Sequence, residues 1–274
     1  MSNLFTRTIS AVVALMLLGL SVKFGRSSLY LLCFVSSLLS LTEFSGLLRR
    51  VGSVTHFEFK VIRIGFVILG SILFVFASRY SQYLIITFPL AFVVLAAAVS
   101  WFVARKENLS ELLPMLNMLF LGFIYCSVLP SVSVRLIELG VGVFLCHLSV
   151  VFGGDIFAYF FGRFLGKYKL HEALSPKKTI EGSIGGLLGS LLLGFGLGPQ
   201  IGFEIPMLQG IILFAVTGLF AQLGDLFESF LKRYAQVKDS GFIMPGHGGV
   251  LDRLDGVLFS SPVFLLIYFL FSRN

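Results

Sequence analysis

Charged side chains are scarce in this 274-residue chain. Asp, Glu, Lys and Arg make up 13% of it, whereas 57% of its residues are hydrophobic and its mean hydropathy is +0.95. A soluble domain of this size needs more polar surface. Apolar stretches recur along the whole length instead, and helices cross a bilayer because they satisfy their own backbone hydrogen bonds. The composition therefore predicts an all-α, polytopic transmembrane protein.

Cysteine is also rare, since the chain has only three, and Cys33, Cys126 and Cys146 each lie in an apolar stretch. Such scattered cysteines provide neither a disulfide framework nor the spacing of a metal site. The sequence further lacks a long hydrophilic linker, a low-complexity tract and a convincing internal repeat. These absences favour one integrated membrane domain.

Apolar continuity predicts about nine membrane spans. We expect them at residues 8–22, 27–48, 64–77, 83–104, 112–129, 136–161, 183–197, 208–231 and 257–271. The first stretch follows Arg7, as the apolar part of a signal peptide would, but no small-residue cleavage site lies near Lys23 to Ser28. We therefore expect this stretch to be a span.

The basic residues lie mainly between the apolar stretches. The net charge is +7, but this placement suits membrane topology and anionic head groups better than nucleic acid, which we do not expect as a partner. Most Lys and Arg residues fall on the side that holds the N-terminus, which predicts that this side is cytosolic. The bias becomes weak when the basic loops of the C-terminal half are set aside.

Charged residues of the N-terminal half gather near the end of the second predicted span. They are Glu43, Arg49, Arg50, Glu58 and Arg63. We expect them to form a solvated cytosolic face. A lipid head-group contact by Arg49 and Arg50 is the alternative.

The densest cluster of ionisable residues lies at residues 229–255, which read S-F-L-K-R-Y-A-Q-V-K-D-S-G-F-I-M-P-G-H-G-G-V-L-D-R-L-D. Ionisable groups near a bilayer are costly, so such a cluster indicates a functional site. Lys and Arg neutralise phosphate oxygens, and carboxylates hold a hard cation such as Mg²⁺. Gly246, Gly248 and Gly249 let the backbone approach a ligand, and their N–H groups can form an anion nest.

This signature run resembles that of the phosphatidate cytidylyltransferases, also called CDP-diacylglycerol synthases. Their pattern is S-x-x-K-R-x₄-K-D-x-G-x₄-G-H-G-G-x-x-D-R-x-D, which the chain matches from Ser229 to Asp255. Met244 stands where the family more often has Leu, Ile or Phe, a change that conserves volume. The resemblance covers the C-terminal half, whereas the N-terminal half matches only in hydrophobic character.

A polar helical face precedes the signature run. Asp155, Tyr159, Gly162 and Arg163 fall at i, i+4, i+7 and i+8, which places them on one face of a helix. Asp155 is then a carboxylate in or near the membrane, either a buried partner of Arg163 or a lysine, or part of a site. The family typically has D-x-x-A-Y-x-x-G-[RK] here, which supports a site role for Asp155 without assigning one.

The run S-P-K-K-T-I-E-G at residues 175–182 is a second basic cluster. Ser175 and Pro176 predict a helix N-cap and first turn, which would place Lys177 and Lys178 at a phosphate-binding helix N-terminus. A basic cytosolic loop explains these lysines equally well. The resemblance favours the phosphate role, because the run is another family hallmark. A stripe for close helix packing follows at a spacing of four: Gly182, Gly186, Ser190 and Gly194.

The helix before the signature loop has a further polar face, at i, i+3, i+4 and i+7: Asp225, Glu228, Ser229 and Lys232. Asp252 and Asp255 follow at the entry to the last span. Buried charges need partners. We therefore predict that Asp225 and Asp252 together bind Mg²⁺, and a second cation is left open.

The resemblance implies transfer of a cytidylyl group from CTP to phosphatidic acid, giving CDP-diacylglycerol and pyrophosphate for phospholipid biosynthesis. We expect a multi-pass protein of the cell (inner) membrane whose active site faces the cytosol, where CTP is found. Residues 1–145 would form scaffold helices on the lipid side, and residues 146–274 would carry the active site. A homodimer is left open.

The predicted catalytic residues are Asp225, Asp252, Lys232, Arg253 and His247. The predicted substrate-binding residues are Asp155, Ser175, Lys177, Lys178, Thr179, Ser229, Arg233, Lys238, Asp239, Gly248, Gly249 and Asp255. The lysines and arginines would bind phosphates, and His247 with the two glycines would line the nucleotide pocket. A role of His247 in shaping the turn alone is the alternative.

Two other functions fit parts of the pattern. A CTP-dependent lipid kinase would share the membrane and the nucleotide but would transfer the γ-phosphoryl group. An ion-coupled transporter also places acidic residues in helices, although it has no need of several basic clusters beside an H-G-G-x-x-D-R-x-D run.

Overall fold

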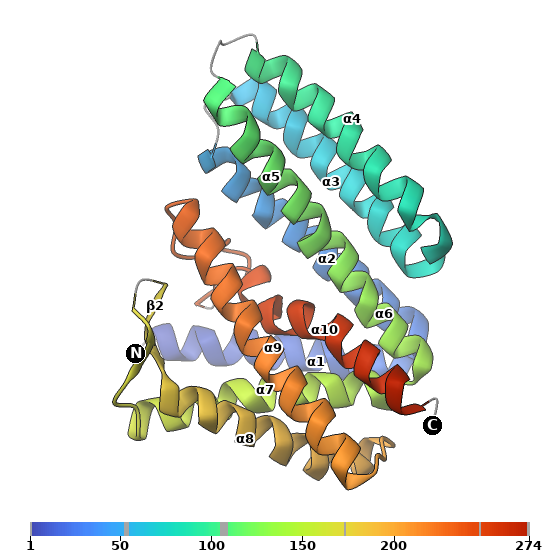
Figure 1. The fold of residues 1–274 in the computed structure, drawn as a ribbon, viewed down its shortest axis with the longest axis vertical. Helices are drawn as coiled ribbons and strands as arrows, with labels where there is room; N and C mark the ends of the chain where they lie inside the picture. Colours follow the sequence, from blue (N-terminus) through green and yellow to red (C-terminus); the bar gives the residue numbers. More distant parts are fainter. Residues whose placement is uncertain (1, 52–54, 105–108, 173, 247, 273–274) are drawn as a thin grey trace. The chain divides into compact units, whose positions relative to one another are not determined.

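The computed structural model describes residues 2–51, 55–104, 109–172, 174–246 and 248–272 (Figure 1). Within these residues, eight helices are long and apolar enough to cross a bilayer, and the apolar part of α1, Thr8–Phe24, is shorter. The prediction of an all-α, polytopic membrane protein with about nine spans is confirmed.

The chain forms two compact units. The first comprises Met1–Val134 and Leu231–Arg253, and the second comprises Arg135–Phe230 and Leu254–Asn274. The helices α9 (Met207–Tyr234) and α10 (Leu251–Ser272) each contribute to both units. The predicted roles of residues 1–145 and 146–274 stay a prediction, because they concern where the chemistry lies.

Neighbouring helices of the first unit follow one another in sequence and lie side by side, α2 on α3, α3 on α4, and α4 on α5 (Figure 1). The elements are α1 (Ser2–Phe24), α2 (Arg26–Val51), α3 (His56–Arg79), a 3₁₀ turn (Ser81–Tyr83), α4 (Leu84–Ala104), a 3₁₀ turn (Leu109–Glu111) and α5 (Leu112–Phe123). Short connections between long apolar helices produce this antiparallel order.

Aromatic rings fill the core of the first unit. Phe66 stacks on Phe44 and on Phe123, with ring centroids 6.1 and 5.0 Å apart, and all three side chains are fully buried. Gly122 makes this close packing of α5 possible, because a Cβ there would lie 2.6 Å from the Phe66 ring. Even a methyl group would overpack this site.

The fifth span is longer than predicted. A π-helical segment, Ile124–Val128, joins α5 to α6 (Leu129–Leu139), and α7 begins only at Val141. The predicted end at residue 129 and the predicted start of the next span at 136 were therefore wrong. Polar residues such as Ser131 and Arg135 lower the local hydropathy, but their side chains bond within the helix, to the Val128 carbonyl and to Glu138.

The second unit combines long helices with one short hairpin. Its elements are α7 (Val141–Phe164), the antiparallel strands β1 (Lys169–His171) and β2 (Ser175–Thr179), α8 (Ile180–Leu197), a 3₁₀ turn (Pro199–Ile201), and most of α9 and α10. Helices α7 and α8 lie side by side over their length (Figure 1).

The predicted small-residue stripe of α8 packs against α7 at Gly182, Gly186 and Ser190 and against Phe214 of α9 at Gly194, which confirms its role in close helix packing. A Cβ on Gly182 would lie 3.0 Å from the Ala158 carbonyl oxygen, so the two backbones approach closely. The Ser190 hydroxyl donates to the Val150 carbonyl at 3.0 Å. Small side chains are the usual means by which membrane helices pack this tightly.

Candidate active site

The signature run folds as the end of α9, a loop, and the start of α10. Helix α9 ends where Gln236 adopts a positive φ of 56° and the Val237 N–H donates to the Lys232 carbonyl at 2.9 Å. The left-handed conformation of Gln236 lets the Val237 N–H reach the Lys232 carbonyl in the last turn of the helix. After this turn the chain enters the loop that contains Gly246, Gly248 and Gly249.

Glycine is required at two turns of this loop. Gly246 and Gly248 have φ angles of 76° and 87°, a region that side chains with a Cβ rarely adopt. The Met244 N–H donates to the Gly248 carbonyl at 3.0 Å and closes the loop tip. His247 lies outside the described residues, so its predicted place in a nucleotide pocket stays a prediction.

Asp252 is the centre of the polar network in the first unit. One carboxylate oxygen, Oδ1, lies 2.5 Å from the Lys232 Nζ. The other, Oδ2, accepts from the Ser240 N–H and hydroxyl, both at 2.9 Å, and from the Gly249 N–H at 2.7 Å. The Asp252 side chain is only 6% exposed, and four donors compensate its loss of hydration. The structure thus brings together residues that the sequence places 20 positions apart.

This network changes the predicted anion nest. The Gly249 N–H donates to Asp252 and is not directed at a ligand. A Cβ on Gly248 would lie 2.7 Å from the Asp252 Oδ2. Both glycines therefore allow the loop backbone to lie close to the Asp252 carboxylate. This role is separate from any contribution to nucleotide binding.

The second unit contains a separate acidic cluster. Asp255 on α10 is buried and interacts electrostatically with Asp225 and Glu228 of α9 and with Asp155 of α7. Gly224 permits this approach, because a Cβ there would lie 2.6 Å from the Asp255 carbonyl oxygen. Carboxylates from three helices therefore repel one another electrostatically around Asp255.

A lysine from the β-hairpin neutralises part of this cluster. The Lys178 Nζ lies 2.5 Å from the Asp225 carboxylate, with the two side chains 25% and 41% exposed. Two predicted site residues, 47 positions apart in the printed sequence, therefore meet. Their contact supports a role for the S-P-K-K run beyond membrane topology.

The predicted helix N-cap at Ser175 was wrong. Ser175–Thr179 is strand β2, paired with β1, and the N-cap of α8 is Thr179, whose hydroxyl accepts from the Gly182 N–H at 3.1 Å. Serine suits an N-cap, but pairing with β1 extends the lysines along a strand and delays the helix by four residues. Lys178 and Lys177 therefore lie one and two residues before Thr179, the N-cap of α8.

Arg163 bonds within its own helical face. Its Nη1 donates to the Tyr159 hydroxyl at 2.7 Å, in agreement with the predicted i, i+4 spacing. Gly162 of the same face lies against α8, where its Cβ would be 3.2 Å from the Thr179 hydroxyl. This face of α7 therefore packs, through Gly162, against the start of α8.

A family model described as the cytidylyltransferase family matches residues 5–271 of the chain. The chain belongs to the cytidylyltransferase family. Its relatives include a protein named phosphatidate cytidylyltransferase from Bacillus subtilis, 46% identical over 125 residues, which cover 45% of this chain and 46% of the relative.

Relatives of the same name occur in Staphylococcus. That of S. saprophyticus is 44% identical over 124 residues, covering 45% of this chain and 48% of the relative, and that of S. epidermidis is 41% identical over 143 residues, covering 52% of each. In these matches the chain spans about half the length of its curated relatives.

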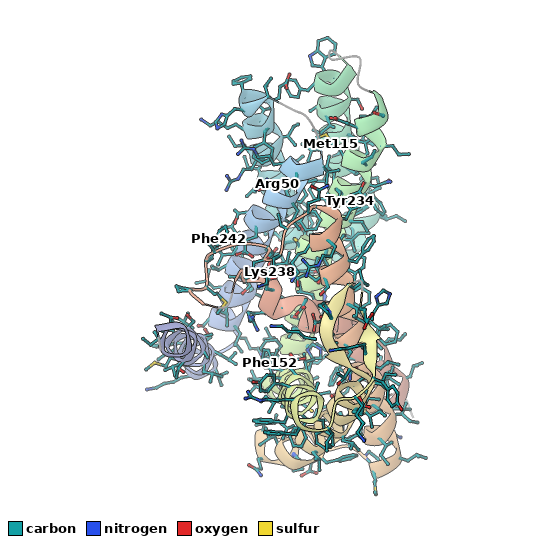
Figure 2. All side chains as sticks on the ribbon, turned by 90° about the vertical axis from the view of Figure 1, so that its left-hand side faces the viewer. Arg50, Met115, Phe152, Tyr234, Lys238 and Phe242 are labelled. Atoms are coloured by element: carbon teal, nitrogen blue, oxygen red, sulfur yellow. The ribbon has the colours of Figure 1, made fainter. Side chains whose placement is uncertain are left out.

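Other predicted site residues of this cytidylyltransferase-family chain are exposed to solvent or lipid. They are Arg233, Lys238, Asp239 and Arg253, while Ser229 is half-buried. Figure 2 shows Lys238 on the loop that follows α9, with Phe242 further along the same loop. Exposed basic side chains such as these can form charge-assisted hydrogen bonds to an anionic ligand.

Glu43 contacts the end of the signature loop, which the sequence-based prediction missed. It was expected on a solvated face, but it lies in α2 with 6% exposure, and its carboxylate accepts from the Val250 and Leu251 N–H groups at 3.0 and 2.9 Å. A signal was present, since Glu43 falls inside the predicted span 27–48 and an intramembrane carboxylate indicates function by default.

Proposed function

We propose that this chain transfers the cytidylyl group of CTP to phosphatidic acid, which yields CDP-diacylglycerol and pyrophosphate. The observation that supports this most directly is that Lys232, Ser240 and Gly249 each donate to Asp252. All four residues belong to the signature run. The relatives named phosphatidate cytidylyltransferase support the same substrates.

The proposed reaction is an in-line displacement at the α-phosphorus of CTP. An oxygen of the phosphatidate phosphate forms the new P–O bond, the bond to the β-phosphate breaks, and pyrophosphate leaves. The attacking phosphate monoester is already an anion near neutral pH, so a strong general base is unnecessary. Catalysis then depends on positioning and on neutralising the phosphates.

The basic residues would perform this neutralisation. We assign the nucleotide and lipid phosphates to Lys177, Lys178, Lys232, Arg233 and Arg253, with Lys238 at the loop. Charge-assisted hydrogen bonds to phosphate are roughly twice as strong as neutral ones. Lys178 and Lys232 are already directed at carboxylates, which keeps both ammonium groups in fixed positions.

We further propose that Asp225 and Asp252 hold Mg²⁺. The chemistry of the donors fits, because Mg²⁺ prefers carboxylate oxygens and commonly takes one or two of them, completed by phosphate oxygens and waters. Among the residues that the structure describes, no group of three or more His, Cys, Asp or Glu residues is arranged for a metal. When bound, Mg²⁺ would neutralise the charge that develops on the leaving pyrophosphate.

The metal assignment has its own test. Asp225→Asn and Asp252→Asn keep the shape but remove the charge, so each variant should fold and lose most Mg²⁺-dependent turnover. The double variant should be little worse than either single one, because residues that act as a unit are non-additive. Independent, multiplying losses would mean that the two carboxylates have separate roles.

We also propose that the protein lies in the cell membrane with this site on the cytosolic side. The charge bias of the loops and the cytosolic location of CTP support this orientation. Phosphatidic acid would then reach the site from the inner leaflet.

Analysis of the products decides the proposed function. Purified protein in detergent is incubated with labelled CTP and phosphatidic acid, with and without Mg²⁺. We expect labelled CDP-diacylglycerol and one pyrophosphate per turnover. CDP with a phosphorylated lipid would indicate a lipid kinase instead, and ion flux into vesicles without nucleotide turnover would indicate a transporter.

A further inference from the structure

Glu43 connects the N-terminal half of the chain to the start of α10. Its Val250 and Leu251 partners lie 207 and 208 positions away in sequence. The first N–H groups of a helix have no acceptor within it and form the positive end of its dipole. A buried carboxylate in turn needs donors. Each group therefore satisfies the other, and α2 caps α10.

The signature loop is shaped around this carboxylate. A Cβ on Gly241 would lie 2.5 Å from the Glu43 Oε1, and one on Gly249 would overlap both the Glu43 Oε2 and the Ser240 hydroxyl. Both positions are fixed glycines of the signature run. Glu43 thus supplies a reason for glycine there that is independent of any ligand.

Glu43 and Asp252 accept hydrogen bonds from consecutive N–H groups of residues 249–251. The Gly249 N–H donates to Asp252, and the next two N–H groups donate to Glu43. The Ser240 hydroxyl lies 2.9 Å from the Asp252 Oδ2 and 3.4 Å from the Glu43 Oε2. Both ends of the loop are therefore attached to the same pair of carboxylates.

We infer that Glu43 is a positioning residue for the proposed cytidylyl transfer. It fixes the backbone of residues 249–251, and through that backbone it sets the directions of Asp252 and Arg253, which follow immediately on α10. The inference rests on the proposed function, in which Glu43 contacts no substrate. Because a misplacement of about 1 Å far from the chemistry can lower a rate about a hundredfold, loss of this contact should affect turnover.

The test uses the full-length protein with CTP, phosphatidic acid and Mg²⁺. Glu43→Gln keeps the shape but places an amide N–H₂ against a backbone donor, and Glu43→Asp keeps the charge on a shorter side chain. The matched control is Glu138→Gln, since Glu138 forms a surface pair with Arg135. Kinetic constants are measured per folded molecule, and hydrogen exchange is measured for residues 249–251.

We expect Glu43→Gln to lower kcat/KM for CTP by about ten- to a hundredfold, in the range of a lost charge-assisted contact. Amide exchange at residues 250 and 251 should become at least about tenfold faster, because their acceptor is weakened. Glu43→Asp should restore part of both properties, and Glu138→Gln should match the wild type.

Three results would overturn the inference. They are wild-type kinetics in Glu43→Gln, slower turnover without faster exchange at 250 and 251, and failure of both Glu43 variants to accumulate as folded protein, which would make Glu43 a folding residue. If wild-type protein turned over no CTP with phosphatidic acid, the proposed function would be refuted. The exchange measurement would still decide whether Glu43 holds the loop.

Discussion

Removing one partner of the Lys232–Asp252 pair should destabilise the protein almost as much as removing both. The two charged atoms lie 2.5 Å apart, and the side chains are 13% and 6% exposed. At an effective dielectric constant of about 20, their attraction is about 7 kcal/mol before desolvation is subtracted. Removing one partner of a buried pair typically costs about 3–5 kcal/mol, because the other charge is left uncompensated.

A double-mutant cycle measures this coupling. Asp252 keeps its Ser240 and Gly249 donors in Lys232→Met, so we expect the lower end of that range, about 3 kcal/mol, for each single variant. For the double variant Lys232→Met with Asp252→Asn, the loss in the free energy of unfolding should be about 2 kcal/mol smaller than the sum of the losses of the two single variants.

The surface pair of Arg135 and Glu138 provides the control. Its atoms are 2.7 Å apart, but the side chains are 33% and 46% exposed. The same cycle there should give only about 0.3–0.5 kcal/mol, because water screens the charges.

Reversible unfolding in mixed micelles, without CTP or Mg²⁺, gives these free energies independently of activity. The double variant should regain stability relative to the sum of the single variants while remaining inactive. A coupling below about 0.5 kcal/mol would equal that of a surface pair. Asp252 would then be held by its Ser240 and Gly249 donors alone, and the reasoning from burial would be refuted.

Two further predictions concern the basic residues and the orientation. Lys177→Ala, Lys178→Ala and Arg253→Ala should each slow turnover by roughly one to two decades, the value of a charge-assisted bond of about 1.5–3 kcal/mol; near wild-type rates in all three would restrict the basic clusters to topology. In a background without the native cysteines, cysteines at Gln200 and at Phe242, which is 92% exposed, should label oppositely. An impermeant thiol reagent outside intact cells should reach position 200 only, and labelling at 242 would reverse the orientation.

The membrane fold could be predicted because hydropathy is a local property. Eight long apolar helices follow from stretches that a window along the sequence detects. Helix ends were less accurate, as α6 shows, because hydropathy falls at Ser131 and Arg135 while the backbone hydrogen bonds continue. Side-chain bonds to Val128 and Glu138 explain why the helix tolerates these polar residues.

The residues of the candidate site could be predicted where they belong to a recognisable run of the sequence. Lys232, Asp252 and the loop glycines belong to one dense run, and the structure joins them in one network. Glu43 was missed because its partners are more than 200 positions away, and no local spacing relates a residue of the second span to the last helix. The Ser175 N-cap failed for a similar reason, since pairing with β1 decided the backbone.

The two lysine–carboxylate pairs suggest how a highly charged substrate could be accommodated. Lys178 with Asp225, and Lys232 with Asp252, each join a proposed phosphate-binding group to a proposed metal ligand. On the proposed function, CTP and Mg²⁺ would exchange these partners, so that each lysine turns to a phosphate as its carboxylate turns to the cation. No charge would be left uncompensated where hydration is poor. Such an exchange requires that CTP and Mg²⁺ strengthen each other's binding by the same factor. Equal CTP affinity with and without Mg²⁺ would contradict it.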